Sequence, residues 1–101
     1  MAIQNPETVE VAPMPALLQA LSDPVRLEIV RQLDAAQGEL TCGQLELPVG
    51  KSTCSHHLKA LSGAGVLVER EEGVRKYLRL RSDDLDQRYP GLLRSVLDGL
   101  A

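Results

Sequence analysis

The sequence predicts a small α+β domain that is mainly helical and carries a single β-hairpin. Apolar residues recur at helical spacing through most of the chain, whereas the alternation typical of strands is confined to residues 66–81. The chain has no Trp or Phe, so its core has to be built from Leu, Val, Ile and Ala. At 101 residues it forms one domain, whose core is marginal unless a second subunit adds burial.

The N-terminal end is predicted to be an arm followed by a short helix. Residues 1–13 contain two prolines and show no sustained period, which is typical of a flexible arm. An apolar run over residues 16–21 then predicts a short helix. This helix is the first element of a domain that spans residues 14–101.

The second helix has a clear start signal. Asp23 can accept hydrogen bonds from the unpaired N–H groups of the first turn, and Pro24 occupies the first helical position, where its missing N–H costs nothing. We expect the helix to end near Gly38, in a left-handed cap. Its apolar face holds Val25, Ile29, Val30 and Leu33.

The middle of the chain has the pattern of a helix-turn-helix. A very short helix capped by Thr41 is followed by a turn that contains Pro48 and Gly50. A longer helix then covers residues 51–61. Two helices joined by a short turn with glycine predict a helix-turn-helix over about residues 41–62.

The helix over residues 51–61 combines an apolar stripe, Cys54, Leu58 and Leu61, with a face of hydrogen-bond donors. No Asp or Glu occurs between residues 51 and 68, so nothing on that face repels phosphate. Such a helix suits the major groove of DNA. The alternative is an ordinary surface helix that happens to lack acids. The residues expected at base edges and phosphates are Lys51, Ser52, Thr53, Ser55, His56 and Lys59.

A hairpin is predicted from two extended runs, residues 66–71 and 74–81, with its turn at residues 72–73. Alternation gives the second run an apolar side, which can pack on the helices, and a basic side with Arg75, Tyr77, Arg79 and Arg81. A basic hairpin directly after a helix of this kind is a wing, here about residues 66–81, and completes a winged helix-turn-helix. The bases expected to hold the wing on the DNA backbone are Arg70, Arg75 and Lys76.

The last part of the chain, residues 83–101, has apolar residues mostly at helical spacing, with Pro90 and Gly91 breaking the helix in two. This segment is too apolar to stand alone. Charge is distributed unevenly: residues 51–81 hold seven bases and three acids, while the remaining residues hold four bases and eleven acids. An acidic body with one basic edge is typical of a protein that offers a single face to a polyanion. A solvated basic hairpin without a partner is the alternative.

Four separated segments carry a family resemblance: LSDPVRLEIV at 21–30, ELTCGQL at 39–45, STCSHHLKALSGAGV at 52–66, and the strand at 73–80. In this order and spacing they resemble the ArsR/SmtB family of winged-helix transcriptional repressors over residues ~16 to 81. The resemblance implies a homodimer through the first and last helices, recognition helices in successive major grooves, and repression relieved by a small signal. The dimer interface would hold Leu17, Leu18, Leu93, Val96, Leu97 and Leu100.

The chain departs from the metal-sensing members of that family. They commonly have a Cys-x-Cys pair before the turn, whereas here one thiol, Cys42, lies between the two expected places. Others bind zinc through Asp and His on the last helix, which here has no His. With His56 and His57 as the only imidazoles, a tetrahedral site has few candidate ligands. We expect no metal and no cofactor; a metal-sensing repressor with an atypical site is the alternative.

Cys42 and Cys54 have two interpretations. Each thiol can serve as a small core residue, since both positions commonly hold Val in the family. The other hypothesis is a redox switch, in which oxidation or alkylation tilts the recognition helix and releases DNA. A positive neighbour such as Lys51 would help by lowering a thiol pKa. A thiol oxidant or a small ligand is therefore expected as the signal, ahead of a metal.

Other classes of protein fit the sequence less well. No apolar run approaches the ~20 residues of a membrane span and no signal-type N-terminus is present, so we expect a cytoplasmic protein without a membrane partner. An enzyme is not expected, because Cys54 and His57 lack a third, orienting residue. The remaining alternative is a protein-protein interaction module that uses the last helix and never touches DNA.

Overall fold

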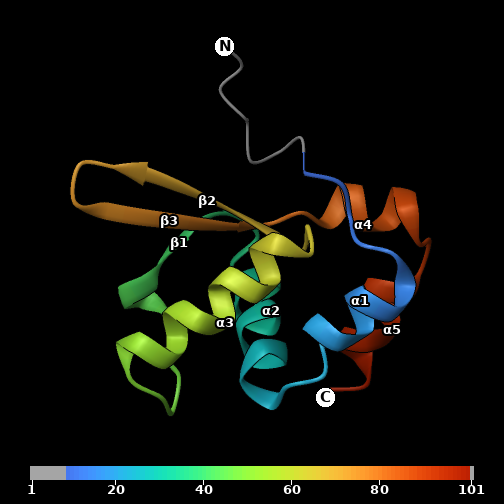
Figure 1. Ribbon diagram of the computed structural model, residues 1–101, viewed down its shortest axis with the longest axis horizontal. Coiled ribbons are helices and arrows are strands. Elements are labelled where there is room, and N and C mark those ends of the chain that lie inside the picture. The colour runs from blue at the N-terminus through green and yellow to red at the C-terminus, as the bar shows by residue number, and fades with distance from the viewer. Residues whose placement is uncertain (1–8, 101) are drawn as a thin grey trace.

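The computed structural model describes residues 9–100, which contain five α-helices, one 3-10 helix and three strands (Figure 1). The hairpin extends past the helices on one side, while α1 and α5 lie together on the other (Figure 1). In chain order the elements are α1 Met14–Ala20, α2 Pro24–Ala36, β1 Leu40–Thr41, η2 Cys42–Gln44, α3 Lys51–Gly63, β2 Leu67–Glu72, β3 Arg75–Leu80, α4 Ser82–Arg88 and α5 Leu92–Asp98. No helix in the described range is long and apolar enough to span a bilayer.

The start of α2 is confirmed and its end is corrected. Oδ1 of Asp23 accepts hydrogen bonds from the backbone N–H groups of Val25, at 2.8 Å, and Arg26, at 3.3 Å. The left-handed residue after the helix is Gln37, with φ 53°, and not Gly38. Both the backbone N–H and the side-chain amide of Gln37 donate to the carbonyl of Asp34, at 3.1 and 2.6 Å, which stabilises this conformation without a glycine.

The predicted flexible arm has to be shortened. Residues 1–8 lie outside the described residues, but residues 9–13 run along the body of the domain. The N–H of Ala12 donates to the carbonyl of Ala64 at 3.0 Å, and the hydroxyl of Tyr89 donates to the carbonyl of Ala12 at 2.9 Å. A Cβ added at Gly65, which has φ +78°, would lie 2.8 Å from the backbone of this segment. Close backbone packing therefore fixes the end of the arm.

The described strands form one antiparallel sheet in the order β1-β3-β2. The sequence predicted the β2-β3 hairpin but missed β1, which is two residues long and pairs Leu40 with Leu78. The turn lies one residue later than predicted, because Glu72 pairs with Arg75 and leaves Gly73 and Val74 in the loop. Gly73 has φ +63°, which suits the first position of a two-residue hairpin turn.

The core is aliphatic, as predicted. The break of the C-terminal segment is also confirmed, since α4 and α5 are separated around Gly91, which has φ +82°. Side chains from α1, α2, α3, the hairpin and α5 meet in one cluster. Its fully buried members include Leu17, Ile29, Val30, Leu33, Leu58, Leu61, Val66, Leu67 and Leu78.

Candidate nucleic-acid interface

The donor face of α3 is exposed along the helix. Leu58 and Leu61 point into the core, so the helical period directs the polar side chains outward. No carboxylate is present on α3, and the exposed groups are hydroxyls, one imidazole and two ammonium groups. The exposed polar residues are Lys51, Ser52, Thr53, Ser55, His56 and Lys59, which is the predicted set.

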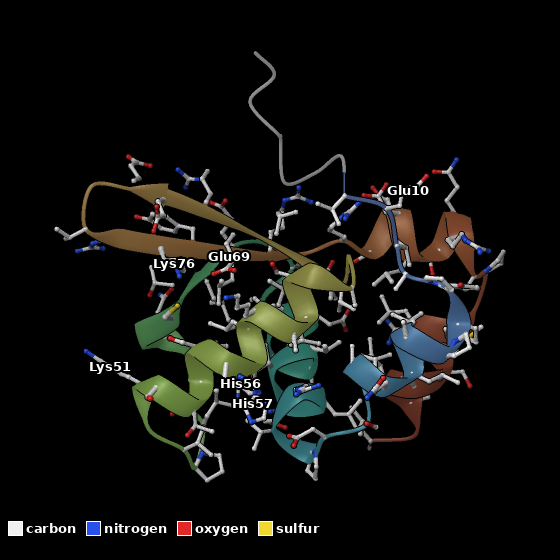
Figure 2. The ribbon with its side chains drawn as sticks, viewed as in Figure 1. Glu10, Lys51, His56, His57, Glu69 and Lys76 are labelled. Carbon is white, nitrogen blue, oxygen red and sulfur yellow. The ribbon has the colours of Figure 1, made fainter. Side chains whose placement is uncertain are left out.

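His57 does not share this face, although it follows His56 directly. The residue is 8 % exposed, and its ring lies toward α2, where Nδ1 accepts a hydrogen bond of 3.0 Å from Nε of Arg26 (Figure 2). Its Nε2 is 3.9 Å from Oδ1 of Asp23, the residue that caps α2. Because Nδ1 is the acceptor, the neutral ring carries its proton on Nε2, beside that carboxylate. A partly buried polar contact therefore joins α3 to the start of α2.

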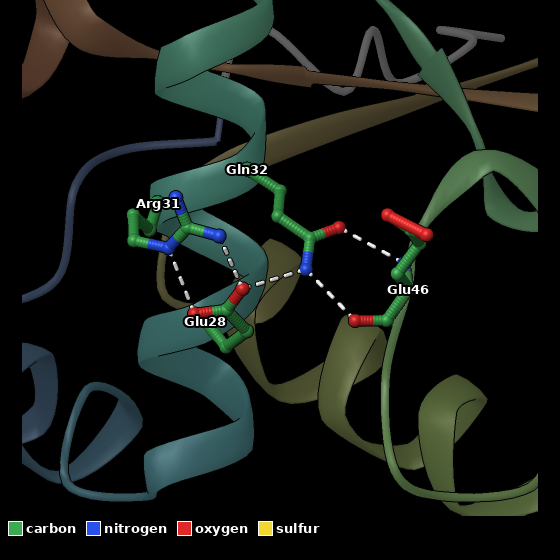
Figure 3. Close-up of polar contacts among 4 residues, drawn as sticks. All are labelled: Glu28, Arg31, Gln32 and Glu46. Atoms are coloured by element: carbon green, nitrogen blue, oxygen red, sulfur yellow. Dashed lines mark hydrogen bonds and ion pairs between the residues drawn. The ribbon is translucent and has the colours of Figure 1, made fainter.

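A second polar contact fixes the turn before α3 (Figure 3). The amide of Gln32, on α2, donates to the backbone carbonyl of Glu46 at 2.8 Å and accepts from its N–H at 2.9 Å. The same amide donates to Glu28 at 2.7 Å, and Glu28 also accepts two hydrogen bonds from Arg31, at 2.8 and 2.6 Å. The bonds from Arg31 and then Gln32 lower the pKa of Glu28 to about 2. Thus α2 positions both α3 and the turn that leads to it.

Arg70 is engaged with acids in the structure. Its guanidinium forms two hydrogen bonds with Glu39, at 3.0 and 2.8 Å, and a third with Glu72, at 2.6 Å. It also lies 4.4 Å from the ring centre of Tyr77. The pKa of Glu39 is lowered, chiefly by the hydrogen bonds from Arg70. Two carboxylates already balance this charge, so a phosphate contact by Arg70, which stays a prediction, would have to replace them.

The other two predicted wing bases differ from each other. Lys76 forms an ion pair with Glu69 at 3.1 Å, on the neighbouring strand (Figure 2). That hydrogen bond raises the pKa of Lys76 above its usual value. Arg75 is exposed at the start of β3, and no carboxylate partner for it occurs within residues 9–100. Of the three predicted wing bases, Arg75 therefore offers its charge most openly.

Arg81 was expected on the basic side of the wing and is instead buried. Its side chain is 5 % exposed, because the strand ends at Leu80 and α4 begins at Ser82. The guanidinium pairs with Asp84 at 3.0 Å and donates to the backbone carbonyl of Val9. It joins the arm to α4 and cannot contact DNA.

A groove of about 560 Å³ lies between η2, the turn, the first half of α3 and the wing tip. Cys42 and Cys54 both line it, and both are half-buried. Burial raises the pKa of both thiols, and for Cys54 the neighbouring Cys42 raises it further. Neither thiol therefore has the lowered pKa that would help the redox-switch hypothesis. At neutral pH both groups are protonated and weakly nucleophilic.

The remaining chemical alternatives find little support. Within residues 9–100 no group of three His, Cys, Asp or Glu side chains could hold a metal ion. The considered pair of Cys54 and His57 does not form, because Nδ1 of His57 accepts from Arg26 and the pKa of Cys54 is raised. Neither a metal centre nor a cysteine nucleophile is assembled in this part of the chain.

The predicted dimer residues divide into two groups. Leu17, Leu93 and Leu97 are at most 7 % exposed and pack in the core of the chain itself. These three side chains therefore offer little surface to a second copy. The three that keep accessible surface on α1, α5 and the residues after it are Leu18, Val96 and Leu100.

Comparisons with known proteins agree with this geometry. A helix-turn-helix domain model matches residues 21–70. The HTH-type transcriptional regulator YceK of Bacillus subtilis is 37 % identical over 82 residues, which are 79 % of this chain and 82 % of that protein. A possible ArsR-family regulator of Mycobacterium bovis, whose winged helix-turn-helix domain was solved as a homodimer, is 30 % identical with a TM-score of 0.64 and covers 97 % of this chain and 91 % of its own. This chain belongs to the ArsR-like family of winged helix-turn-helix transcriptional regulators.

A further solved structure extends the comparison. The transcriptional repressor BigR of Xylella fastidiosa is 27 % identical, with a TM-score of 0.67 over 87 % of this chain and 86 % of that one. An ArsR-like chain is a DNA-binding regulator and not an enzyme. The features that sequence reasoning missed are the contacts made by α2. Arg26 contacts His57, 31 positions away, and Gln32 contacts Glu46, 14 positions away. No local sequence pattern predicts such pairs.

Proposed function

We propose that this regulator is a sequence-specific repressor that binds double-stranded operator DNA through α3. The observation that carries the proposal is the exposed face of α3, with donors only and no acid, held against α2 by His57. Ser52, Thr53, Ser55 and His56 would contact base edges or nearby phosphates, and Lys51 and Lys59 would neutralise phosphates. Arg75 and Lys76 would place the wing on the backbone.

We also propose that the DNA-binding form is a homodimer. The M. bovis domain is homodimeric, and this chain leaves apolar surface at Leu18, which is 48 % exposed, and at Val96 and Leu100. A two-fold axis through this surface would place two copies of α3 about one DNA turn apart. Sedimentation should therefore show a dimer, and Leu18→Glu should shift it toward monomer.

The signal that releases DNA was expected to be a thiol oxidant or a small ligand. The raised pKa of both thiols favours a ligand. The test is diamide treatment of the wild-type repressor on its operator, beside the Cys42→Ser, Cys54→Ser double variant. If diamide releases DNA from the wild type alone, the result supports the redox-switch hypothesis. If both proteins keep their DNA, the redox switch is excluded and a small ligand remains as the expected signal.

The salt dependence of DNA binding tests the proposed function. The logarithm of affinity should fall linearly with the logarithm of salt concentration, by about 0.9 for each phosphate contact. Lys59→Ala should weaken binding to all sequences and reduce that slope by about 1, whereas His56→Ala should change which sequence is preferred. Arg94→Ala is the control, because it removes an exposed base on α5. If the chain instead binds a protein partner with an affinity that changes little with salt concentration, it is a protein-interaction module.

A further inference from the structure

The groove between η2, α3 and the wing tip has the size of a small-molecule site. Its volume of about 560 Å³ lies within the roughly 300–1,000 Å³ typical of ligand pockets. Three separate segments form its walls: residues 41–49, the first two turns of α3, and the start of β3 with its turn. A molecule bound there would therefore contact η2, the turn, the first half of α3 and the wing tip, but not the far end of α3.

Part of the lining is apolar. Leu47 and Val49 come from the turn before α3, and Val74 comes from the wing tip, where its side chain is fully exposed. The thiols of Cys42 and Cys54 add two weakly polar groups that are neutral at pH 7, because burial raises the pKa of both. Phosphate oxygens are not complementary to such a surface, whereas an apolar ligand is.

The charged part of the lining has one sign. Lys51, Arg75 and Lys76 contribute cations, and no Asp or Glu of the described chain lines the groove. Lys76 already pairs with Glu69, whereas for Lys51 and Arg75 no carboxylate partner occurs within residues 9–100. The cations flank the apolar side chains from two elements, with Lys51 on α3 and Arg75 on β3. An anionic group combined with an apolar body is complementary to both parts of the lining.

We propose that this groove binds a small organic anion with an apolar body, and that the bound anion releases DNA. The release follows from shared residues and rests on the proposed function, since Lys51, Arg75 and Lys76 belong to the proposed DNA surface. An anion held between α3 and the wing neutralises these charges and separates the wing from phosphate. The coupling is direct competition, so it needs no second conformation of the protein.

Octanoate is the probe, with octan-1-ol and octylammonium as neutral and cationic controls of the same chain length. Amide chemical shifts of the full chain, recorded without DNA, report binding. We expect octanoate to shift amides around Cys42, Val49, Ser55 and Val74 in a saturable manner, and the two controls to do so at least tenfold more weakly. Absence of groove shifts, or equal binding of octan-1-ol, would overturn the proposal.

Two variants with one added carboxylate sharpen the test. Ser55→Glu places the charge on the exposed wall of the groove, whereas Ala35→Glu places it on the exposed side of α2. Ser55→Glu should weaken octanoate binding about tenfold by like-charge repulsion, and Ala35→Glu should leave it unchanged. Equal effects of the two variants would contradict a groove site.

A competition experiment then separates the two claims. Octanoate should displace the wild-type chain from DNA over the concentration range in which it fills the groove. Binding in the groove without displacement would overturn the release mechanism alone. A chain that binds octanoate but no DNA at any salt concentration would refute the proposed function and leave the ligand site standing.

Discussion

The two sides of α3 differ in how firmly they are held. Toward α2, Leu61 is fully buried, and His57 accepts a hydrogen bond of 3.0 Å from Arg26. Toward η2 and the wing, Cys54 is half-buried beside an open groove, and the nearby donors are exposed. One side therefore determines where the helix points, and the other side is left for ligands.

This difference separates positioning from recognition. An exposed side chain reaches a base edge reproducibly only when the backbone that carries it is fixed, and here α2 supplies that support through Arg26 and Gln32. The groove side is open, and its walls hold the residues that a ligand or DNA would contact. Substitutions on the closed side should thus change stability, and those on the open side should change binding.

The largest effect is expected for Leu61→Ala on the closed side. Leu61 has no exposed surface, so its truncation removes buried methyl groups and leaves a cavity. We expect a loss of about 2–5 kcal/mol in the free energy of unfolding, measured by urea denaturation. The control is Val74→Ala on the open side, which should stay within about 0.5 kcal/mol. Similar losses in the free energy of unfolding for both variants would contradict the proposed difference between the two sides of α3.

A smaller effect is expected at the joint between α2 and α3. In His57→Ala the guanidinium Nε of Arg26 loses its acceptor in a partly buried position. The free energy of unfolding should fall by about 1–3 kcal/mol. His56→Ala, one residue away and exposed, is the matched control and should be neutral for stability. If His56→Ala lowers the free energy of unfolding more than His57→Ala does, it is wrong that His57 is the ring that joins α3 to α2.

Acid should weaken the contact that holds the turn. The pKa of Glu28 is lowered to about 2, chiefly by the hydrogen bonds from Arg31. A lowered pKa stabilises the folded state above the unfolded value of about 4.5, and that contribution is lost as the pH falls toward 2. Glu28→Gln should therefore flatten the decline of stability between these two pH values. Superimposable pH profiles for the two proteins would show that the network contributes nothing.

The smallest effect is expected for the thiols. Cys42→Val together with Cys54→Val should change the free energy of unfolding by less than about 1.5 kcal/mol and should preserve DNA binding, because both thiols pack as small side chains. In the wild type, modification by iodoacetamide at pH 7 should be slower than for glutathione and should accelerate as the pH rises. Fast modification at neutral pH would mean that one thiol is activated.

The sequence was most informative where structure follows local spacing. The period of α3 identified its exposed donors, and Asp23 with Pro24 identified the start of α2. The two-residue strand β1 was missed because such a short segment has no recognisable alternation. The pairing of Arg70 with Glu39 was missed because the two residues are 31 positions apart and only the folded sheet brings them together. The groove likewise depends on three segments whose approach no single pattern encodes.

The most direct test of the central claim is an amide chemical-shift titration of the chain with duplex DNA from upstream of its own gene. The account predicts large changes at Ser52, Ser55, His56 and Lys59 on α3, and at Arg75 on the wing. It predicts little change at α4, which lies on the opposite side of the molecule from the hairpin tip (Figure 1). Changes concentrated on α4 and α5, with α3 unaffected, would contradict the account.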